Sequence, residues 1–397
     1  MIERIDQSND KKISITLMAP FVILTIQYFI LIYFNLLGTT YGNRVQLMSK
    51  AIVGVVFLYV LPVVIRRSKE NFITVYSIAA TLFLIHYLIF PKNHIYIKEL
   101  IFPFFFMCLP AFVYSMSLSD WQVLKQIMKK SSLIIFFFGT ILGIFNYFGW
   151  ASVGTYSMSL SYYMLIPTLI FLDELLDAFS LRNLIFSFIS IMTVLTLGSR
   201  GAIMCILVFT ILKVSRFYFK LTYTKILYYM ISLGIAVFIF IYLDHILKSL
   251  YNFLLNYGIR SRSILLFMRG EIHLSGRESI YQSIMRNILD NPILGIGLGG
   301  DRLVIGGGYA HNFFIEVLGD FGIFVGGIII VTLSLLIIKS LLTKNKDKYN
   351  MIIIWLSLGF VHLMVSGSYL IDIKFWIFMG ILTSIFSNRI CERSPGS

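Results

Sequence analysis

Two short stretches of this chain each contain an arginine whose position could suit the binding of a phosphate group. Arg200 lies in LGSRGA, residues 197–202, between two apolar segments, and Arg277 lies in LSGRESIYQSIMRNIL, residues 274–289. Guanidinium is planar, permanently charged and able to contact a phosphate at two points. An arginine at the edge of hydrocarbon is usually paired or functional, although it can also extend its charge to lipid headgroups. We therefore expect both arginines to bind an anionic group.

The second stretch also predicts a surface helix that begins near Arg277. Ser275 can cap its first turn, and Glu278 stands at the capping-box distance from that serine. A helix N-terminus itself favours anions. Arg286 follows half a turn away from the face of Arg277, so it suits a role in supporting the loop. The Asn-Pro pair at 291–292 is expected to end the helix.

A third stretch, GGGYAHNFFIEVLGDFG at 306–322, brings a proton-carrying side chain to the start of an apolar helix. Its glycines lead into Tyr309, His311 and Asn312. Imidazole takes up and releases a proton near neutral pH, which suits a general base. Judged by itself, His311 fits a general base and an interfacial helix cap equally well.

Other familiar site patterns are weak in this chain. Gly295, Gly297 and Gly300 match GxGxxG, but a dinucleotide fold needs a strand before them and a βαβ unit around them. We expect a tight turn between a surface helix and the next membrane span instead. None of the six histidines pairs at metal-ligand spacing with a carboxylate or thiolate, so we expect no metal site.

The apolar composition predicts an all-α polytopic membrane protein. Of 397 residues, 58% are hydrophobic and 13% are charged, whereas soluble domains are about half apolar and about a quarter charged. Segments of about 17–25 apolar residues are long enough to cross the hydrocarbon. We place twelve such spans, or eleven if the two that flank GSRG form one: 13–37, 51–65, 72–90, 99–116, 131–149, 157–173, 183–198, 201–215, 225–243, 313–338, 350–368 and 374–388.

The pattern of basic residues predicts which side each loop faces. With the N-terminus in the cytoplasm, the short external loops are nearly free of Lys and Arg, as the positive-inside rule expects. The net charge of +14 therefore reflects topology, and we expect no nucleic-acid partner. The segment 117–130 is expected to lie as an amphipathic piece on the cytoplasmic surface.

One external connection, roughly residues 244–311, departs from this pattern because it is long and rich in arginine. Its apolar periodicity suggests short helices that pack over the membrane face. The expected division is transmembrane helices 1–9 in 1–243, a large external loop with the active-site residues in 244–312, helices 10–12 in 313–390, and a cytoplasmic tail in 391–397.

Taken in order on this topology, these stretches resemble the O-antigen ligase/polymerase superfamily. The resemblance consists of SRG between two spans, SGR inside one long external loop, and then PxxGxG and AHN before a late span. At motif level it covers about 197–201 and 275–322. The chain looks most like a Wzy-type polymerase of O-antigen or capsular repeat units. An arginine-x10-glycine spacing described in some polymerases fits Arg286 and Gly297.

The resemblance implies a GT-C-like enzyme that transfers glycans from undecaprenyl diphosphate at the outer face of the bacterial cytoplasmic (inner) membrane. Arg200 and Arg277 match the motif arginines and would bind the donor diphosphate. His311 matches the family's histidine and would deprotonate the acceptor hydroxyl, with inversion at the anomeric carbon. No cofactor or metal is implied, because the diphosphate carries the driving force and the arginines stand in for a cation. Supporting roles fall to Arg286, Asn312, Glu278 and Tyr309, and Glu316 and Asp320 are further carboxylates that could orient His311 or hold an arginine.

Two other functions stay open at this point. A ligase that moves glycan onto lipid A-core or protein shares the donor chemistry and differs only in its acceptor. A transporter or lipid flippase suits twelve spans, but transporters usually carry repeated halves with ionisable groups at the membrane midplane. Expected partners are the lipid-linked donor and acceptor glycans, membrane lipid, a flippase and a chain-length regulator, and both termini are expected in the cytoplasm.

Overall fold

The structure is a computed structural model that describes residues 2–147, 158–197, 199–216, 243–256, 258 and 277–392. The regular structure of these residues is helical throughout, with no strand among them. The chain forms two compact units. Unit 1 comprises Met1–Ile23, Leu47–Ser131 and Leu274–Ser397, and unit 2 comprises Leu24–Gln46 and Ser132–His273.

Several helices in the described residues are long and apolar enough to cross a membrane. The six candidates are Asp6–Tyr33, Thr40–Ile89, Pro91–Met116, Trp121–Phe145, Phe313–Leu341 and Lys346–Val365. Two shorter apolar helices cover Leu181–Leu195 and Ile373–Phe386. An all-helical chain of this kind is a polytopic membrane protein, as the composition predicts. The total of twelve spans stays a prediction, and the predicted span 225–243 falls almost wholly outside the described residues.

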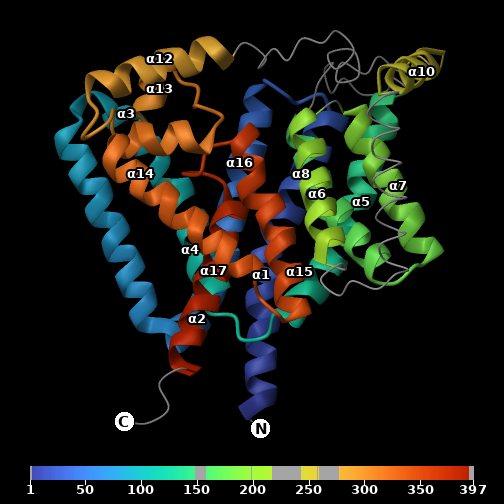
Figure 1. The fold of residues 1–397 in the computed structure, drawn as a ribbon, viewed down its shortest axis with the longest axis horizontal. Coiled ribbons are helices and arrows are strands. Elements are labelled where there is room, and N and C mark those ends of the chain that lie inside the picture. The colour runs from blue at the N-terminus through green and yellow to red at the C-terminus, as the bar shows by residue number, and fades with distance from the viewer. Residues whose placement is uncertain are drawn as a thin grey trace. The chain divides into compact units, whose positions relative to one another are not determined.

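Unit 1 holds the helices around the predicted catalytic histidine. α12 and α13 lie at the end of this unit opposite to the N-terminus of α1 (Figure 1). The elements that lie wholly or mainly in unit 1 are α1 (Ile2–Tyr33), α2 (Thr40–Ile89), η1 (Pro91–Asn93), α3 (His94–Pro103), the π-helix η2 (Phe104–Cys108), α4 (Leu109–Met116), α12 (Arg277–Asp290), α13 (Gly300–Ile305), α14 (Phe313–Leu341), α15 (Lys346–Trp355), the π-helix η3 (Leu356–Val361), α16 (His362–Val365) and α17 (Ile373–Glu392).

The predicted surface helix after the long loop is present as α12. It begins at Arg277 and ends at Asp290, directly before the Asn-Pro pair. Ile284 and Ile288 on its inner face are fully buried and pack in one cluster with Ala310. This packing fixes the start of α12 next to the chain segment that carries His311. Ser275, the predicted cap, lies outside the described residues.

The predicted second and third spans, 51–65 and 72–90, are the two arms of one helix, α2. Ser68 breaks its helical geometry with φ −144° and ψ 47°. A straight helix would place Leu58 and Leu84 about 39 Å apart at 1.5 Å per residue, yet both line one cavity. The arms therefore fold back on each other at Ser68.

α5 differs from the sequence prediction at its start. It runs without interruption from Trp121 to Tyr147, so the predicted amphipathic piece at 117–130 is mostly the first turns of a membrane-length helix. Only 117–120 lie outside that helix. The amphipathic first turns of α5 and its apolar remainder share one helical period. The change in composition between them therefore does not mark the end of a helix.

Unit 2 contains helices that precede the long loop and one helix, α10, within the first part of that loop. They are most of α5, α6 (Met158–Asp177), α7 (Leu181–Thr196), α8 (Arg200–Arg216) and α10 (Leu243–Asn256). Its core includes Ile32, Leu142, Leu160 and Leu197. The fully buried Lys213 of α8 contacts two carboxylates of α6, with 2.5 Å between Nζ and Oδ1 of Asp173 and 3.1 Å between Nζ and Oδ2 of Asp177.

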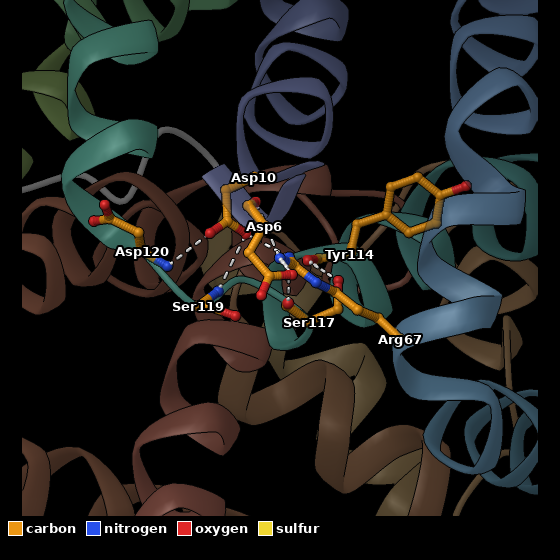
Figure 2. Close-up of polar contacts among 7 residues, drawn as sticks. All are labelled: Asp6, Asp10, Arg67, Tyr114, Ser117, Ser119 and Asp120. Atoms are coloured by element: carbon orange, nitrogen blue, oxygen red, sulfur yellow. Dashed lines mark hydrogen bonds and ion pairs between the residues drawn. The ribbon is translucent and has the colours of Figure 1, made fainter. Parts of the chain in front are cut away.

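An ionic latch at the N-terminal end of unit 1 joins α1 to the turn of α2 and to the start of α5 (Figure 2). Asp10 is 1% exposed. It accepts hydrogen bonds from Nη1 of Arg67 at 2.5 Å, from the Ser119 amide at 3.3 Å and from the Asp120 amide at 3.1 Å. Arg67 also contacts Asp6, with 3.0 Å between Nη2 and Oδ1. Because Arg67 directly precedes Ser68, the latch holds the turn between the two arms of α2.

Replacing Asp10 by alanine is expected to destabilise unit 1 by about 3 kcal/mol, because it removes the buried charged partner of Arg67 and leaves two amides without their acceptor. Thermal unfolding in detergent measures the loss as a lower midpoint. Asp6→Ala is the matched control, since Asp6 is exposed and such pairs contribute under about 1 kcal/mol. Equal midpoints for the two variants would show that Asp10 is not the centre of the latch.

Candidate active site

His311 stands in a strained turn at the α12 end of unit 1. Its φ of 56° lies in the left-handed region, which among the described non-glycine residues it shares only with Asn35. Such a conformation costs about 1–2 kcal/mol and persists only where surrounding contacts hold it. The carboxylate of Asp301 accepts a hydrogen bond from the Ala310 amide at 2.9 Å. Asn312 follows as the N-cap of α14 and accepts from the amides of residues 314 and 315 at 3.0 and 3.2 Å.

The environment of the His311 ring favours the neutral form. The ring is half-buried and packs against Tyr309, with 4.2 Å between ring centroids. Burial, together with the positive charge of Arg277, lowers the pKa of His311 to about 4. Its Nδ1 atom is buried and makes no hydrogen bond with a described residue. A neutral imidazole can accept a proton from a substrate hydroxyl that reaches one of its ring nitrogens.

Arg277 is positioned by the last turn of α16. Its Nη1 atom donates a hydrogen bond to the carbonyl of Val365. One residue earlier, the carbonyl of Met364 accepts from Nδ2 of Asn312 at 3.3 Å. The segment that ends α16 thus holds the arginine at the start of α12 and the residue after His311. This arrangement keeps the cation and the imidazole at the same end of the unit.

A buried polar cluster lies beneath this surface and joins α13, α14 and the linker after α16. Arg302 donates from Nη2 to the Ser368 hydroxyl at 3.2 Å, and that hydroxyl donates to Glu316. The Tyr369 amide donates to Glu316 at 3.1 Å, and the Tyr369 hydroxyl donates to Asp320 at 2.6 Å. The members are Asp301, Arg302, Glu316, Asp320, Ser368 and Tyr369, all at most 7% exposed.

The charges of the buried polar cluster do not balance. Three carboxyl groups face the single guanidinium of Arg302, and burial raises the pKa of Asp301. The nearest Asp301–Arg302 approach is 3.9 Å between Oδ1 and Nη1, an ion pair without a hydrogen bond, since neither atom has one among the described residues.

The glycine-rich segment before α13 makes a close crossing against α14. Gly322 breaks α14 with φ 76°. The freed groups bond across the crossing: the Ile323 amide donates to the Pro292 carbonyl at 2.8 Å, and the Gly319 carbonyl accepts from the Ile296 amide at 2.7 Å. A Cβ atom on Gly295 would lie 2.3 Å from the Gly319 oxygen. The GxGxxG match is therefore a turn, as the sequence analysis expects.

Two polar side chains from the end of α2 and from η1 hold the same segment in place. Nδ1 of His86 accepts from the Leu298 amide at 3.1 Å. Nδ2 of Asn93 donates to the carbonyls of Ile296 and Leu298 at 2.8 and 3.2 Å. His86 thus has a structural role within a membrane-length helix. These bonds fix the chain on the α2 side of the site.

The structure shows no contact between His311 and either Glu278 or Arg286 among the described residues. Glu278 and Arg286 are exposed on α12, where no described contact joins them to the buried polar cluster. Arg200 is the first residue of α8, and the Ser199 hydroxyl accepts from the Ala202 amide at 3.3 Å to cap that helix. Arg200 belongs to unit 2, so its approach to His311 stays a prediction.

Sequence reasoning did not identify Asp301, Arg302, Ser368 or Tyr369 as site residues. One available signal was the pair Glu316 and Asp320, four residues apart on one face of an otherwise apolar helix, where carboxylates are rare. Their partners are contributed by segments about fifty residues later, which no local pattern links to them.

A family of known proteins matches the part of the chain that carries His311 and Arg277. Residues 185–331 match the model of a family described as O-antigen ligase (Wzy_C). The chain contains a domain of the O-antigen ligase/polymerase superfamily. No curated protein and no solved structure matches the chain.

The O-antigen ligase domain spans both units and includes the predicted site residues Arg200, Arg277 and His311. The contacts of Arg277 and Asn312 with the end of α16, and those of Glu316 with Ser368, reach beyond the matched residues. Within the part of the chain that the structure describes, no group of three or more His, Cys, Asp or Glu side chains could hold a metal ion.

The activity is expected to fall as the pH drops through about 4, because the lowered pKa keeps His311 neutral above that value. A histidine with an ordinary pKa would lose its base form below about 6.5. Arg277→Gln removes a positive charge that disfavours the imidazolium, so the acid limb should move to higher pH. Initial rates of glycan transfer in vesicles, measured across pH 3.5–8 for the wild type and for Arg277→Gln, give the acid limb of each protein. An unchanged limb in the variant would exclude charge coupling between the two residues.

Replacing Asp301 by alanine is expected to lower kcat roughly 10²-fold with little change in KM, because the Ala310 amide loses its acceptor and the neighbouring His311, the predicted base, would shift from its position. Asp301→Asn keeps an acceptor oxygen and should recover most of the rate. Steady-state kinetics of both variants separate the two effects. Equal losses in the two variants would mean that the negative charge matters, and the hydrogen bond to Ala310 does not.

Proposed function

We propose that this protein is a polymerase that joins undecaprenyl-diphosphate-linked oligosaccharide repeat units into surface polysaccharide, O-antigen or capsule. The supporting observation is an imidazole held in a left-handed turn, whose pKa is lowered by burial and by the positive charge of Arg277. Both residues belong to an O-antigen ligase domain, whose family implies lipid-linked polysaccharide substrates in a membrane. A base beside a phosphate-binding cation is what glycosyl transfer from a lipid diphosphate needs.

In the proposed reaction, His311 takes the proton of the acceptor hydroxyl while that oxygen attacks the anomeric carbon of the donor. The new glycosidic C–O bond forms as the C–O bond to the diphosphate breaks, and the configuration inverts. The electron pair of the broken bond leaves on the prenyl diphosphate. A well-placed donor to such developing charge contributes about 3–4 kcal/mol. Arg277 supplies one such group, and Arg200 supplies the second if the two units bring it to the same pocket.

The proposal includes the finer features of the predicted architecture. Twelve spans and a GT-C-like arrangement would place the site at the outer face of the cytoplasmic membrane, with both termini inside. The two guanidiniums neutralise the diphosphate, so the reaction as proposed uses no metal or cofactor. A flippase would deliver the repeat units, and a chain-length regulator would set the product size.

A ligase is the second candidate, because the matched family is described as O-antigen ligase. It would use the same donor and the same residues, and it would transfer the glycan to lipid A-core or to a protein. The polymerase and the ligase differ in what a deletion strain accumulates. Loss of a polymerase leaves single repeat units attached to the final acceptor, whereas loss of a ligase leaves full-length glycan on the lipid carrier.

Mass spectrometry of lipid-linked and surface glycans, from cells with and without the gene, tests the proposed function. We expect single repeats at the surface and no long chains in the deletion strain, with restoration by the intact gene. Long chains stranded on the carrier lipid would establish the ligase. An unchanged glycan profile would contradict both candidates.

A further inference from the structure

The end of α16 holds both sides of the candidate site. Its last two residues, Met364 and Val365, provide the carbonyls that accept from Asn312 and from Arg277. α16 is the last turn of a continuous apolar helix that covers Lys346–Val365, and the π-helix η3 lies directly before it. Because a π-helix bonds each residue to the fifth one along, it rotates the residues that follow, and such turns are frequent at functional sites. The contacts that fix α16 behind η3 therefore decide where Arg277 and Asn312 are held.

Two close backbone approaches surround the first residue of α16, His362. η3 crosses the start of α17, where a Cβ atom on Gly359 would lie 2.7 Å from the Lys374 carbonyl oxygen and 2.9 Å from the Cα atom of Phe375. The linker between α16 and α17 folds back at Gly367, which has φ 85°, and a Cβ atom there would lie 3.3 Å from Cε1 of His362. Glycine permits both approaches because it has no side chain. The His362 ring is therefore enclosed by the linker and by the neighbouring helix ends.

Inside this enclosure, His362 contacts the carboxylate of Asp372, with 3.1 Å between Nδ1 and Oδ2. The other carboxylate oxygen, Oδ1, accepts a hydrogen bond from the Phe375 amide in the first turn of α17 at 3.0 Å. Lys374 supplies the balancing charge, with 3.8 Å between Nζ and Oδ2 of Asp372. His362 and Lys374 are 5% and 7% exposed, and buried charged groups persist only where partners compensate them. These contacts fix the start of α16 to the start of α17.

We propose that His362 and Asp372 are positioning residues of the candidate active site, because their contact orients the last turn of α16. This inference rests on the proposed function, which assigns the diphosphate to Arg277 and the proton transfer to His311. His362 and Val365 are the first and last residues of α16, so a shift of the helix at His362 also moves the Val365 carbonyl that accepts from Arg277. His362 is buried and does not meet the substrate, so it acts through the residues that α16 holds.

Replacing His362 by alanine removes this contact and keeps the pair of Asp372 and Lys374, so the buried carboxylate retains a charged partner. The kcat for glycan transfer should fall roughly 10–10²-fold, because a displacement of about 1 Å at the reacting groups can cost about 10²-fold. His362→Asn places an amide nitrogen near the position of Nδ1, where it can donate to Asp372, and should recover most of the rate. Equal losses in the two variants would refute the role of the contact.

A double-mutant cycle separates positioning from a general loss of stability. If His362 acts through Arg277, His362→Ala should lower the rate by a clearly smaller factor in an Arg277→Ala background than in the wild type, because the effects of coupled residues are not additive. The matched control is Ser357→Ala on η3, since Ser357 is buried and its hydroxyl makes no hydrogen bond with a described residue. This control should keep the wild-type rate. An equal factor for His362→Ala in both backgrounds, or an equal loss in Ser357→Ala, would overturn the proposal.

Hydrogen exchange of the intact protein in vesicles keeps the test independent of the enzymatic activity. In His362→Ala, the amides of residues 314 and 315, which Asn312 caps, should exchange roughly two- to tenfold faster, the effect of weakening one hydrogen bond. Residues 330–338 of the same helix should exchange as in the wild type, and Ser357→Ala should change neither part. Faster exchange at 314 and 315, in a protein whose wild type transfers no glycan, would contradict the proposed function and still support the positioning role. Unchanged exchange, or an equal rise in both parts of α14, would refute that role.

Discussion

Replacing His311 by alanine is expected to reduce glycan chain growth about 10²–10⁴-fold, the usual contribution of a general base. The Nδ1 atom of His311 is buried and has no hydrogen-bond partner among the described residues. The lowered pKa keeps the ring neutral at physiological pH, so it can act as a base. The substitution removes no described hydrogen bond of the His311 side chain, so the protein level in the membrane should stay normal. Single-turnover transfer from a lipid-linked donor, measured beside an immunoblot, separates the two quantities.

The control for this variant is His94→Ala. His94 lies at the same end of unit 1, stacks on Tyr87 and bonds the Tyr87 carbonyl through Nε2 at 2.7 Å, and it takes no part in the site. Activity should persist in that variant. Chain growth by the His311 variant at the wild-type rate would remove the base assignment, because no other described imidazole shares its surroundings.

Replacing Arg277 by alanine is expected to reduce transfer roughly 10²–10³-fold, about 3–4 kcal/mol of lost stabilisation of the leaving diphosphate. Part of the loss is positional, since the guanidinium also donates to the Val365 carbonyl. Arg277→Lys keeps the charge and loses the planar two-point contact, so it should recover only a fraction of the rate. Steady-state kinetics with a fixed acceptor measure kcat and KM for the donor in both variants.

Lys92→Ala is the matched control for the loss of a cation. Lys92 is an exposed residue of η1 at the same end of unit 1. If Arg277→Ala lowers the rate no more than Lys92→Ala does, the effect comes from the general positive potential of the surface. In that case the specific role of Arg277 at the diphosphate would be wrong.

Local sequence patterns predict much of the helical architecture. The window 313–338 corresponds to α14, Phe313–Leu341, and the surface helix predicted near Arg277 corresponds to α12, Arg277–Asp290. Both predictions rest on hydrophobic length and helix-end chemistry, which act within a few residues. The order of the arginine and histidine motifs also indicated the superfamily that the comparison supports.

Long-range contacts explain what the sequence does not reveal. The turn of α2 at Ser68 depends on Arg67 meeting Asp10, fifty-seven residues away. The buried polar cluster depends on Arg302 meeting Ser368, sixty-six residues away. The backbone conformation of His311 follows from its neighbours Asp301 and Asn312, and a left-handed histidine has no signature in composition. Each of these features depends on a tertiary contact that no local sequence pattern predicts.

The proposed function requires that Arg277 and His311 line one pocket outside the bilayer. Single-cysteine variants at positions 200, 277 and 311, probed in sealed vesicles of known orientation with a membrane-impermeant maleimide, test this requirement most directly. We expect labelling of all three positions from the external side, with protection of positions 277 and 311 by a prenyl diphosphate. Labelling of position 200 from the cytoplasmic side, or protection of position 311 alone, would contradict the proposed function.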